Sequence, residues 1–267
     1  MALNLICESV GSGPPLVVLH GLFGSSGNWR GVARALAGTH TVVSVDLRNH
    51  GASPWADSMD YVEMADDVLQ LIERLRLRRP TVMGHSMGGK VAMALALRHP
   101  LRIARLVVVD IAPVSYADKV TPFAEAMRNA DVMAAASRAE VQRHLQQAVP
   151  DDRVVPFLMQ NLVARNDHFD WRLNLLGIGL AMPQLCAFPT SLLGSRFDGP
   201  VGVIAGMNSD YVAERDGASF QPMFARAEVE VIEDAGHWVH ADQPEAFLAS
   251  LERALQRDAQ PSIAETQ

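Results

Sequence analysis

The sequence predicts a single α/β domain in which helices cover both faces of a mostly parallel sheet, with a helical segment inserted late in the chain. Short, continuous apolar runs such as residues 16–19 and 41–45 are typical of strands buried on both faces. Between such runs, apolar residues recur at helical spacing, as in residues 61–75. This alternation indicates a parallel sheet, and the length of 267 residues suits one domain with an insertion.

The expected elements follow one another in a regular order. Residues 3–7 are expected to form a short edge strand, closed by the glycine and proline turn at residues 11–15. The polar loop at residues 46–54 is expected to be a structural network, because its Asp, Arg and His side chains can satisfy one another. Further strands are expected at residues 16–19, 41–45, 80–83, 105–109, 201–205 and 229–232, and helices at residues 28–36, 61–75, 91–97 and 244–255.

The composition changes between residues 114 and 197, where strand-like runs disappear and helical segments interrupted by prolines take over. We therefore expect a core formed by residues 1–113 and 198–257, a helical cap at residues 114–197, and a frayed tail at residues 258–267. The large apolar residues of the cap are candidates for a substrate pocket, although most such residues simply pack against one another: Phe123, Met127, Met133, Phe157, Met159, Trp171, Leu176 and Met182.

Composition and charge narrow the possible partners. The formal net charge is -7 and no basic cluster is present, which argues against nucleic acid as a partner. No run is long enough to cross a membrane, and the first residues lack the pattern of a secretory signal. Cys7 and Cys186 lack metal-type spacing, so two reduced thiols are the default, with a disulfide left open. We expect a cytoplasmic protein, either a monomer or a small homo-oligomer.

The strongest chemical signal is the G-x-S-x-G pattern formed by Gly84, Ser86 and Gly88. It follows an apolar run and precedes an almost wholly apolar segment, which is the strand and buried helix that a nucleophile elbow requires. On such a turn the Ser86 hydroxyl is exposed, and the backbone N–H of Met87 lies at a helix N-terminus that favours negative charge. The alternative is an ordinary glycine-containing turn with a capping serine.

A second loop, residues 20–24, follows the apolar run that ends at residue 19 and contains two glycines. The backbone N–H of Leu22 in this loop is a candidate second oxyanion donor beside that of Met87. An ordinary turn is the alternative. Phe23 in this loop and Trp238, near the end of the chain, are the expected substrate contacts.

A serine nucleophile needs a base, and His237 fits best because it lies in a glycine-containing turn after the last expected strand. His240, three residues later, is a weaker candidate. His85 is adjacent to Ser86, but neighbouring side chains on a strand point to opposite faces, so it is a poor candidate.

Two carboxylates compete for the role of the acid that orients the base. Asp110 and Asp210 both follow expected strands, at the carboxyl ends where such a sheet builds its site. The usual spacing of strand, glycine, two residues and aspartate, counted from Gly206, falls on Ser209, so Asp210 comes one residue late. This spacing favours Asp110 and leaves Asp210 as the alternative.

Taken together, these motifs resemble the α/β-hydrolase superfamily, and more narrowly the YbfF-type esterases, which are small bacterial carboxylic-ester hydrolases. The resemblance implies a mostly parallel eight-stranded sheet, a Ser86, His237 and Asp110 triad, an acyl-enzyme intermediate, a small-molecule ester substrate, and no metal or organic cofactor. Many relatives lack a carboxylate in the loop at residues 208–210, where this chain has Asp210. The stretches that carry the resemblance are residues 20–25, 46–51, 84–90, 109–113, 171–175 and 235–240.

Two other functions fit the same residues. A thioesterase acting on acyl-CoA would use the same triad and would need a basic patch at the mouth of the cap. A ligand-binding homologue without useful turnover is the second alternative. The candidates for a basic patch are Arg138, Arg143, Arg153, Arg165 and Arg172.

Overall fold

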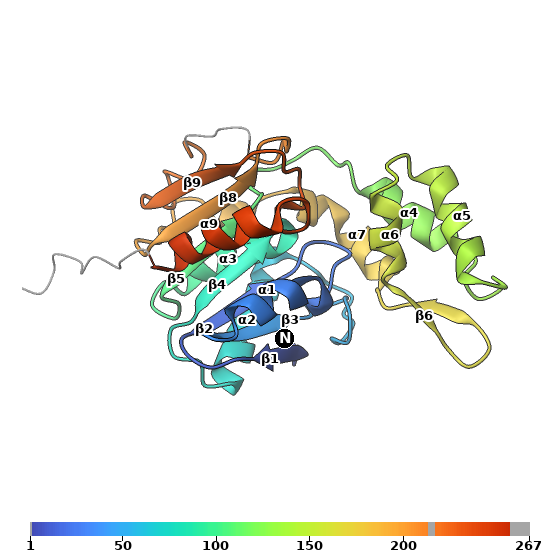
Figure 1. The fold of residues 1–267 in the computed structure, drawn as a ribbon, viewed down its shortest axis with the longest axis horizontal. Helices are drawn as coiled ribbons and strands as arrows, with labels where there is room; N and C mark the ends of the chain where they lie inside the picture. The colour runs from blue at the N-terminus through green and yellow to red at the C-terminus, as the bar shows by residue number, and fades with distance from the viewer. Residues whose placement is uncertain (1, 213–216, 257–267) are drawn as a thin grey trace, which may run out of the picture.

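A seven-stranded sheet forms the centre of the molecule in the computed structural model, which describes residues 2–212 and 217–256 (Figure 1). The strand order is β1-β3-β2-β4-β5-β8-β9, and only the β1–β3 pair is antiparallel. The mostly parallel sheet predicted from the apolar runs is thereby confirmed. Its strands are β1 (Cys7–Val10), β2 (Pro15–Leu19), β3 (Thr41–Val45), β4 (Thr81–His85), β5 (Arg105–Val109), β8 (Val201–Gly206) and β9 (Ala227–Ile232).

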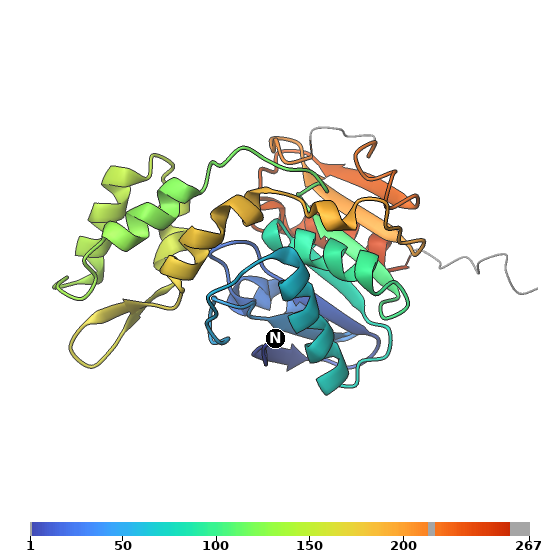
Figure 2. The same cartoon turned by 180° about the vertical axis from the view of Figure 1, so that it is seen from behind.

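Helices cover both faces of this sheet. In Figure 1, α1 (Arg30–Leu36) and α9 (Pro244–Gln256) lie on the near face, and Figure 2 shows α2 (Tyr61–Arg74) and α3 (Met87–Arg98) on the other. Each pair buries its own apolar cluster against the strands. Because both faces are covered, the central strands read as continuous apolar runs rather than alternating ones. Short elements complete the core: η1 (Ser26–Trp29) and α8 (Val239–Asp242).

The segment between β5 and β8 lies mainly beside the sheet, with α4, α5, α6 and β6 grouped together (Figure 1). Besides the helices expected for this segment, it contains a two-stranded hairpin that was not predicted from the sequence. Three-residue strands are too short for a period to show in the sequence. The elements here are α4 (Thr121–Asn129), α5 (Arg138–Ala148), α6 (Val154–Met159), β6 (Leu162–Ala164), β7 (Phe169–Trp171), α7 (Leu175–Cys186) and η2 (Thr190–Leu192).

The N-terminal edge differs from the prediction. In the described residues the sheet has seven strands rather than eight, and its edge strand begins at Cys7 instead of residue 3. The amides of the preceding residues bond elsewhere: Leu3 donates to Oδ1 of Asp67 at 2.6 Å, and Ile6 donates to Oγ of Ser53 at 2.8 Å. This stretch is therefore held by helix α2 and the polar loop instead of a strand ladder. The expected frayed tail lies outside the described residues.

Strand β4 and helix α3 pack against each other without a side chain between them. A Cβ at Gly84 would lie 2.1 Å from the carbonyl oxygen of Gly88, and a Cβ at Gly88 would lie 2.5 Å from the carbonyl oxygen of His20. Both distances are far below van der Waals contact with backbone atoms, which cannot move aside. The two glycines of the motif are thus required by the junction itself.

We expect Gly84→Ala to lower the free energy of unfolding by about 3 kcal/mol, because the new methyl group overpacks a rigid junction. Gly31→Ala is the matched control, since no atom lies within 4 Å of its Cβ position in helix α1. That substitution should raise stability by up to about 1 kcal/mol through helix propensity. Chemical denaturation of both variants measures the difference, and equal stabilities would contradict the packing argument.

Candidate active site

Ser86 occupies the turn between β4 and α3 with φ 51° and ψ -119°. A non-glycine residue in this region costs about 1–3 kcal/mol of backbone free energy. The close packing of the neighbouring glycines must therefore hold Ser86 in this conformation. The loop at residues 20–24 lies directly against the serine, since a Cβ at Gly21 would be 3.3 Å from the Ser86 Cβ. The elbow geometry expected from the motif is therefore present.

Asp110 directly follows strand β5, and it has a fully buried side chain and a φ of 49°. Its Oδ2 lies 2.7 Å from Nδ1 of His237, and its Oδ1 accepts the backbone N–H of Gly206 at 3.0 Å. The hydroxyl of Ser209 also donates to Oδ2. The carboxylate is thus held by three donors from strand β8, the loop after it, and the loop that carries His237.

The orientation of His237 follows from this contact. With Nδ1–H donating to Asp110, the free Nε2 is available as an acceptor. Its ring stacks on Tyr211 with centroids 4.2 Å apart, and its carbonyl oxygen lies 2.8 Å from Nε2 of His85. Because the side chain of His237 remains 24% exposed, it is accessible from the cavity described below.

The side chains of the two alternatives for the acid and the base, Asp210 and His240, make other contacts. The Asp210 side chain is 94% exposed, and its nearest described cation is Nζ of Lys119 at 3.9 Å. His240 stacks on Trp29 at 4.3 Å, and burial lowers its pKa to about 4. The structure therefore brings Asp110 and His237 together and leaves Asp210 facing solvent.

Two buried histidines fix the loop at residues 20–24. The amide of Phe23 donates to Nε2 of His50 at 3.1 Å, and the amide of Leu47 donates to Nε2 of His20 at 3.0 Å. Burial lowers the pKa of both rings, that of His50 to about 3, so they remain neutral acceptors. In the described residues, the amides of Leu22 and Met87 donate to no protein acceptor, and both residues line one small cavity with Ser86.

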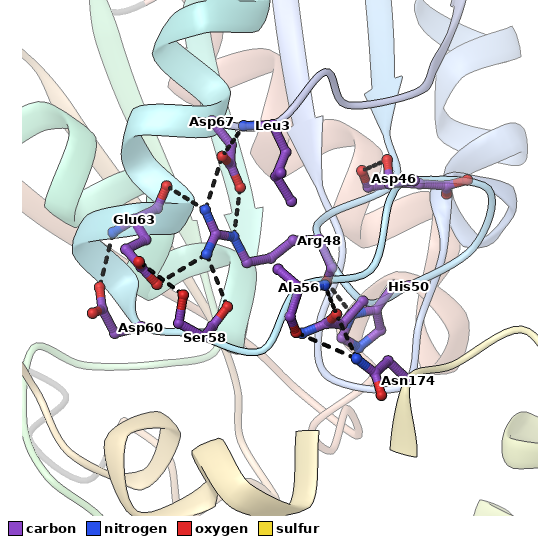
Figure 3. A network of polar contacts seen from close by, with 12 residues as sticks. Leu3, Asp46, Arg48, His50, Ala56, Ser58, Asp60, Glu63, Asp67 and Asn174 are labelled. Carbon is purple, nitrogen blue, oxygen red and sulfur yellow. Dashed lines mark hydrogen bonds and ion pairs between the residues drawn. The ribbon is translucent and has the colours of Figure 1, made fainter. Parts of the chain in front are cut away.

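The loop after β3 forms a structural network, as expected (Figure 3). Its charged side chains do not satisfy one another, however: Arg48 pairs with carboxylates of helix α2, and Asp46 accepts from the backbone amides of Ser26 and Ala52. The guanidinium of Arg48 is buried and binds both carboxylate oxygens of Asp67, at 2.7 and 2.9 Å, and Oε2 of Glu63 at 2.9 Å. Asn174, which precedes helix α7, donates from Nδ2 to Oδ1 of Asn49 at 3.1 Å. This loop therefore joins helix α2, the histidine-held loop and the inserted segment.

A cavity of about 850 Å³ opens above these groups and is lined by Ser86 and His237. Phe23 and Trp238, the expected substrate contacts, both line it. Of the apolar cap candidates, Phe123 and Phe157 line it, whereas Met133 and Leu176 are exposed. The remaining candidates pack inside the molecule: Met127, Met159, Trp171 and Met182.

Two site residues were missed by sequence reasoning. Ser209 was used only to count a spacing, although its hydroxyl binds Asp110. His85 was considered only as a base, whereas it bonds to the backbone of His237. Within residues 2–212 and 217–256, no group of three or more His, Cys, Asp or Glu residues is arranged to hold a metal, and no helix is long and apolar enough to cross a membrane.

Residues 14–244 match the family model of the alpha/beta hydrolase fold, so the chain belongs to that family. Two curated relatives are similar over most of their length. The esterase YbfF of Escherichia coli is 35% identical over 90% of this chain and 92% of its own, and the sn-1-specific diacylglycerol lipase ABHD11 of Xenopus tropicalis is 38% identical over 90% and 77%. A solved marine microorganism esterase is 32% identical, with a TM-score of 0.90 over 94% of this chain and 99% of its own. The expected family resemblance is confirmed.

Substitution of two neighbouring aspartates in helix α2 measures how much the Arg48 network contributes to the free energy of unfolding. Asp67→Ala should cost about 3–5 kcal/mol, because it leaves a buried guanidinium without its main partner. Asp66→Ala should cost at most about 1 kcal/mol, since Asp66 pairs with Arg98 at 2.9 Å on a largely exposed surface. Urea denaturation measures both, and similar losses would show that the buried pair does not hold the loop.

Proposed function

We propose that this protein is a serine carboxylesterase that acts on short to medium acyl esters through an acyl-enzyme intermediate. Ser86 is the nucleophile, His237 the general base and Asp110 the acid that orients it. The observation that carries the proposal is the 2.7 Å contact between Asp110 and His237 beside a cavity that Ser86 also lines. The amides of Leu22 and Met87 supply the oxyanion hole.

Each group has a defined task in the proposed reaction. Nε2 of His237 removes the proton as Oγ of Ser86 attacks the ester carbonyl carbon, and Asp110 stabilises the imidazolium that forms. The oxygen of the tetrahedral intermediate accepts hydrogen bonds from the two amides. Collapse breaks the bond to the alcohol, which leaves with the proton from His237. Water then repeats these steps on the acyl-enzyme and releases the acid.

Similarity to proteins named as esterases and lipases supports the general class, and the chain is a carboxylic ester hydrolase. The charge around the cavity favours an ester over an acyl-CoA thioester, because its two lining cations, Lys119 and Arg153, are balanced by two lining carboxylates, Asp151 and Asp242. Of the five arginines weighed for a basic patch, Arg153 is the one that lines the cavity in the described structure, and its guanidinium pairs with Asp151 at 3.2 Å. Arg138 is occupied by the carbonyl oxygens of Leu162 and Met159.

Replacing each candidate acid tests the proposal directly. Asp110→Asn should lower kcat for p-nitrophenyl butyrate by about 10⁴-fold, because the amide disrupts the tautomer that leaves Nε2 of His237 free. Asp210→Asn should change kcat by no more than about twofold, since that side chain faces solvent. Steady-state kinetics with Ser86→Ala as the blank gives both values. The reverse ranking would overturn the assignment of the acid, and the absence of Ser86-dependent turnover would favour a binding protein.

A further inference from the structure

Ser86 lies between two cavities of very different size. The large one holds about 850 Å³, and a second one holds about 60 Å³. Leu22 and Tyr211 line both cavities together with Ser86. His237 lines the large cavity, whereas Met87 lines the small one. Ser86 therefore has the large cavity on the side of His237 and the small cavity on the side of Met87, one of the two proposed oxyanion donors.

The chemistry of ester cleavage assigns the two sides. In the tetrahedral intermediate, the carbon attached to Ser86 carries an oxyanion, a leaving oxygen and an acyl substituent. The leaving oxygen must receive a proton from His237, so it lies within hydrogen-bond reach of that ring. The oxyanion points to the amides of Leu22 and Met87. The acyl substituent is then directed away from His237.

We infer that the small cavity binds the acyl group and the large cavity binds the alcohol, so that the preferred substrates are esters of short acyl groups with large alcohols. This inference rests on the proposed function and narrows its substrate class. A single water-sized sphere needs about 10–15 Å³ of such space. A cavity of about 60 Å³ therefore admits only a few carbons of an acyl chain.

One wall of the small cavity is formed by the last turn of helix α7, with Leu185 and Cys186 among its lining residues. Side chains of the core hold the carbonyl groups of this turn. The hydroxyl of Tyr61 donates to the carbonyl oxygen of Leu185 at 2.5 Å, and Nζ of Lys90 donates to those of Cys186 and Ala187 at 3.2 and 2.8 Å. Because three hydrogen bonds from helices α2 and α3 fix this wall, it cannot move easily to make space for a longer acyl chain.

A pair of isomeric esters tests the inference on the unmodified protein. Hexyl acetate and ethyl hexanoate have the same atoms and differ only in which side of the ester is long. We expect kcat/KM for hexyl acetate to exceed that for ethyl hexanoate by about tenfold or more. Equal values, or a preference for ethyl hexanoate, would overturn the inference while leaving the esterase function intact. Failure to hydrolyse either ester or p-nitrophenyl acetate would instead overturn the proposed function, and the inference with it.

Two variants identify the wall. Leu185→Ala should reduce the preference for ethyl acetate over ethyl hexanoate by about tenfold, because it lengthens the small cavity. Phe157→Ala is the matched control, because Phe157 lines the large cavity. It should change the ratio of kcat/KM for hexyl acetate to that for ethyl acetate, and it should leave unchanged the acyl-length ratio, which is kcat/KM for ethyl acetate divided by that for ethyl hexanoate. A Leu185→Ala protein that folds and keeps the wild-type acyl-length ratio would contradict the assignment of the wall. If this variant does not fold, the comparison of hexyl acetate with ethyl hexanoate on the wild-type protein still tests the inference.

Discussion

At the Ser86 turn, the backbone of strand β4 packs directly against the backbone of helix α3. This contact sets the strained φ of 51° at Ser86 and leaves no side chain between the turn and the strands beside it. The same constraint brings the loop at residues 20–24 against the serine, through Gly21. The position of Ser86, the proposed nucleophile, and those of its neighbouring amides and of the two cavities all depend on this one junction.

The histidines around this junction differ in burial, and their roles differ with it. His20, His50 and His85 are enclosed, and burial lowers the pKa of each, so these rings stay neutral and act as fixed hydrogen-bond partners for backbone groups. His237 is partly exposed and has a buried carboxylate at its Nδ1. In this way the neutral rings hold the loops in position, while the ring of His237, the proposed base, is accessible from the large cavity.

Much of the central sheet and the positions of its polar loops could be predicted, because buried parallel strands and glycine-rich turns leave strong local signals. The edge strand could not, since the amides of Leu3 and Ile6 bond to side chains that are remote in sequence. The role of Ser209 was hidden for the same reason: its partner Asp110 lies 99 residues earlier in the chain. The hairpin of β6 and β7 consists of strands too short to show a period. The spacing already favoured Asp110 over Asp210, but only the structure shows that the Asp110 carboxylate lies 2.7 Å from Nδ1 of His237 whereas that of Asp210 faces solvent.

The most direct measurement is covalent labelling with an organophosphonate that mimics the tetrahedral intermediate, followed by peptide mass spectrometry. We expect one label per chain, located on Ser86 and lost in His237→Ala, because the hydroxyl of Ser86 needs the adjacent base to become nucleophilic. Labelling of a different serine, or labelling of Ser86 that is unaffected by His237→Ala, would contradict the nucleophile and base assigned here.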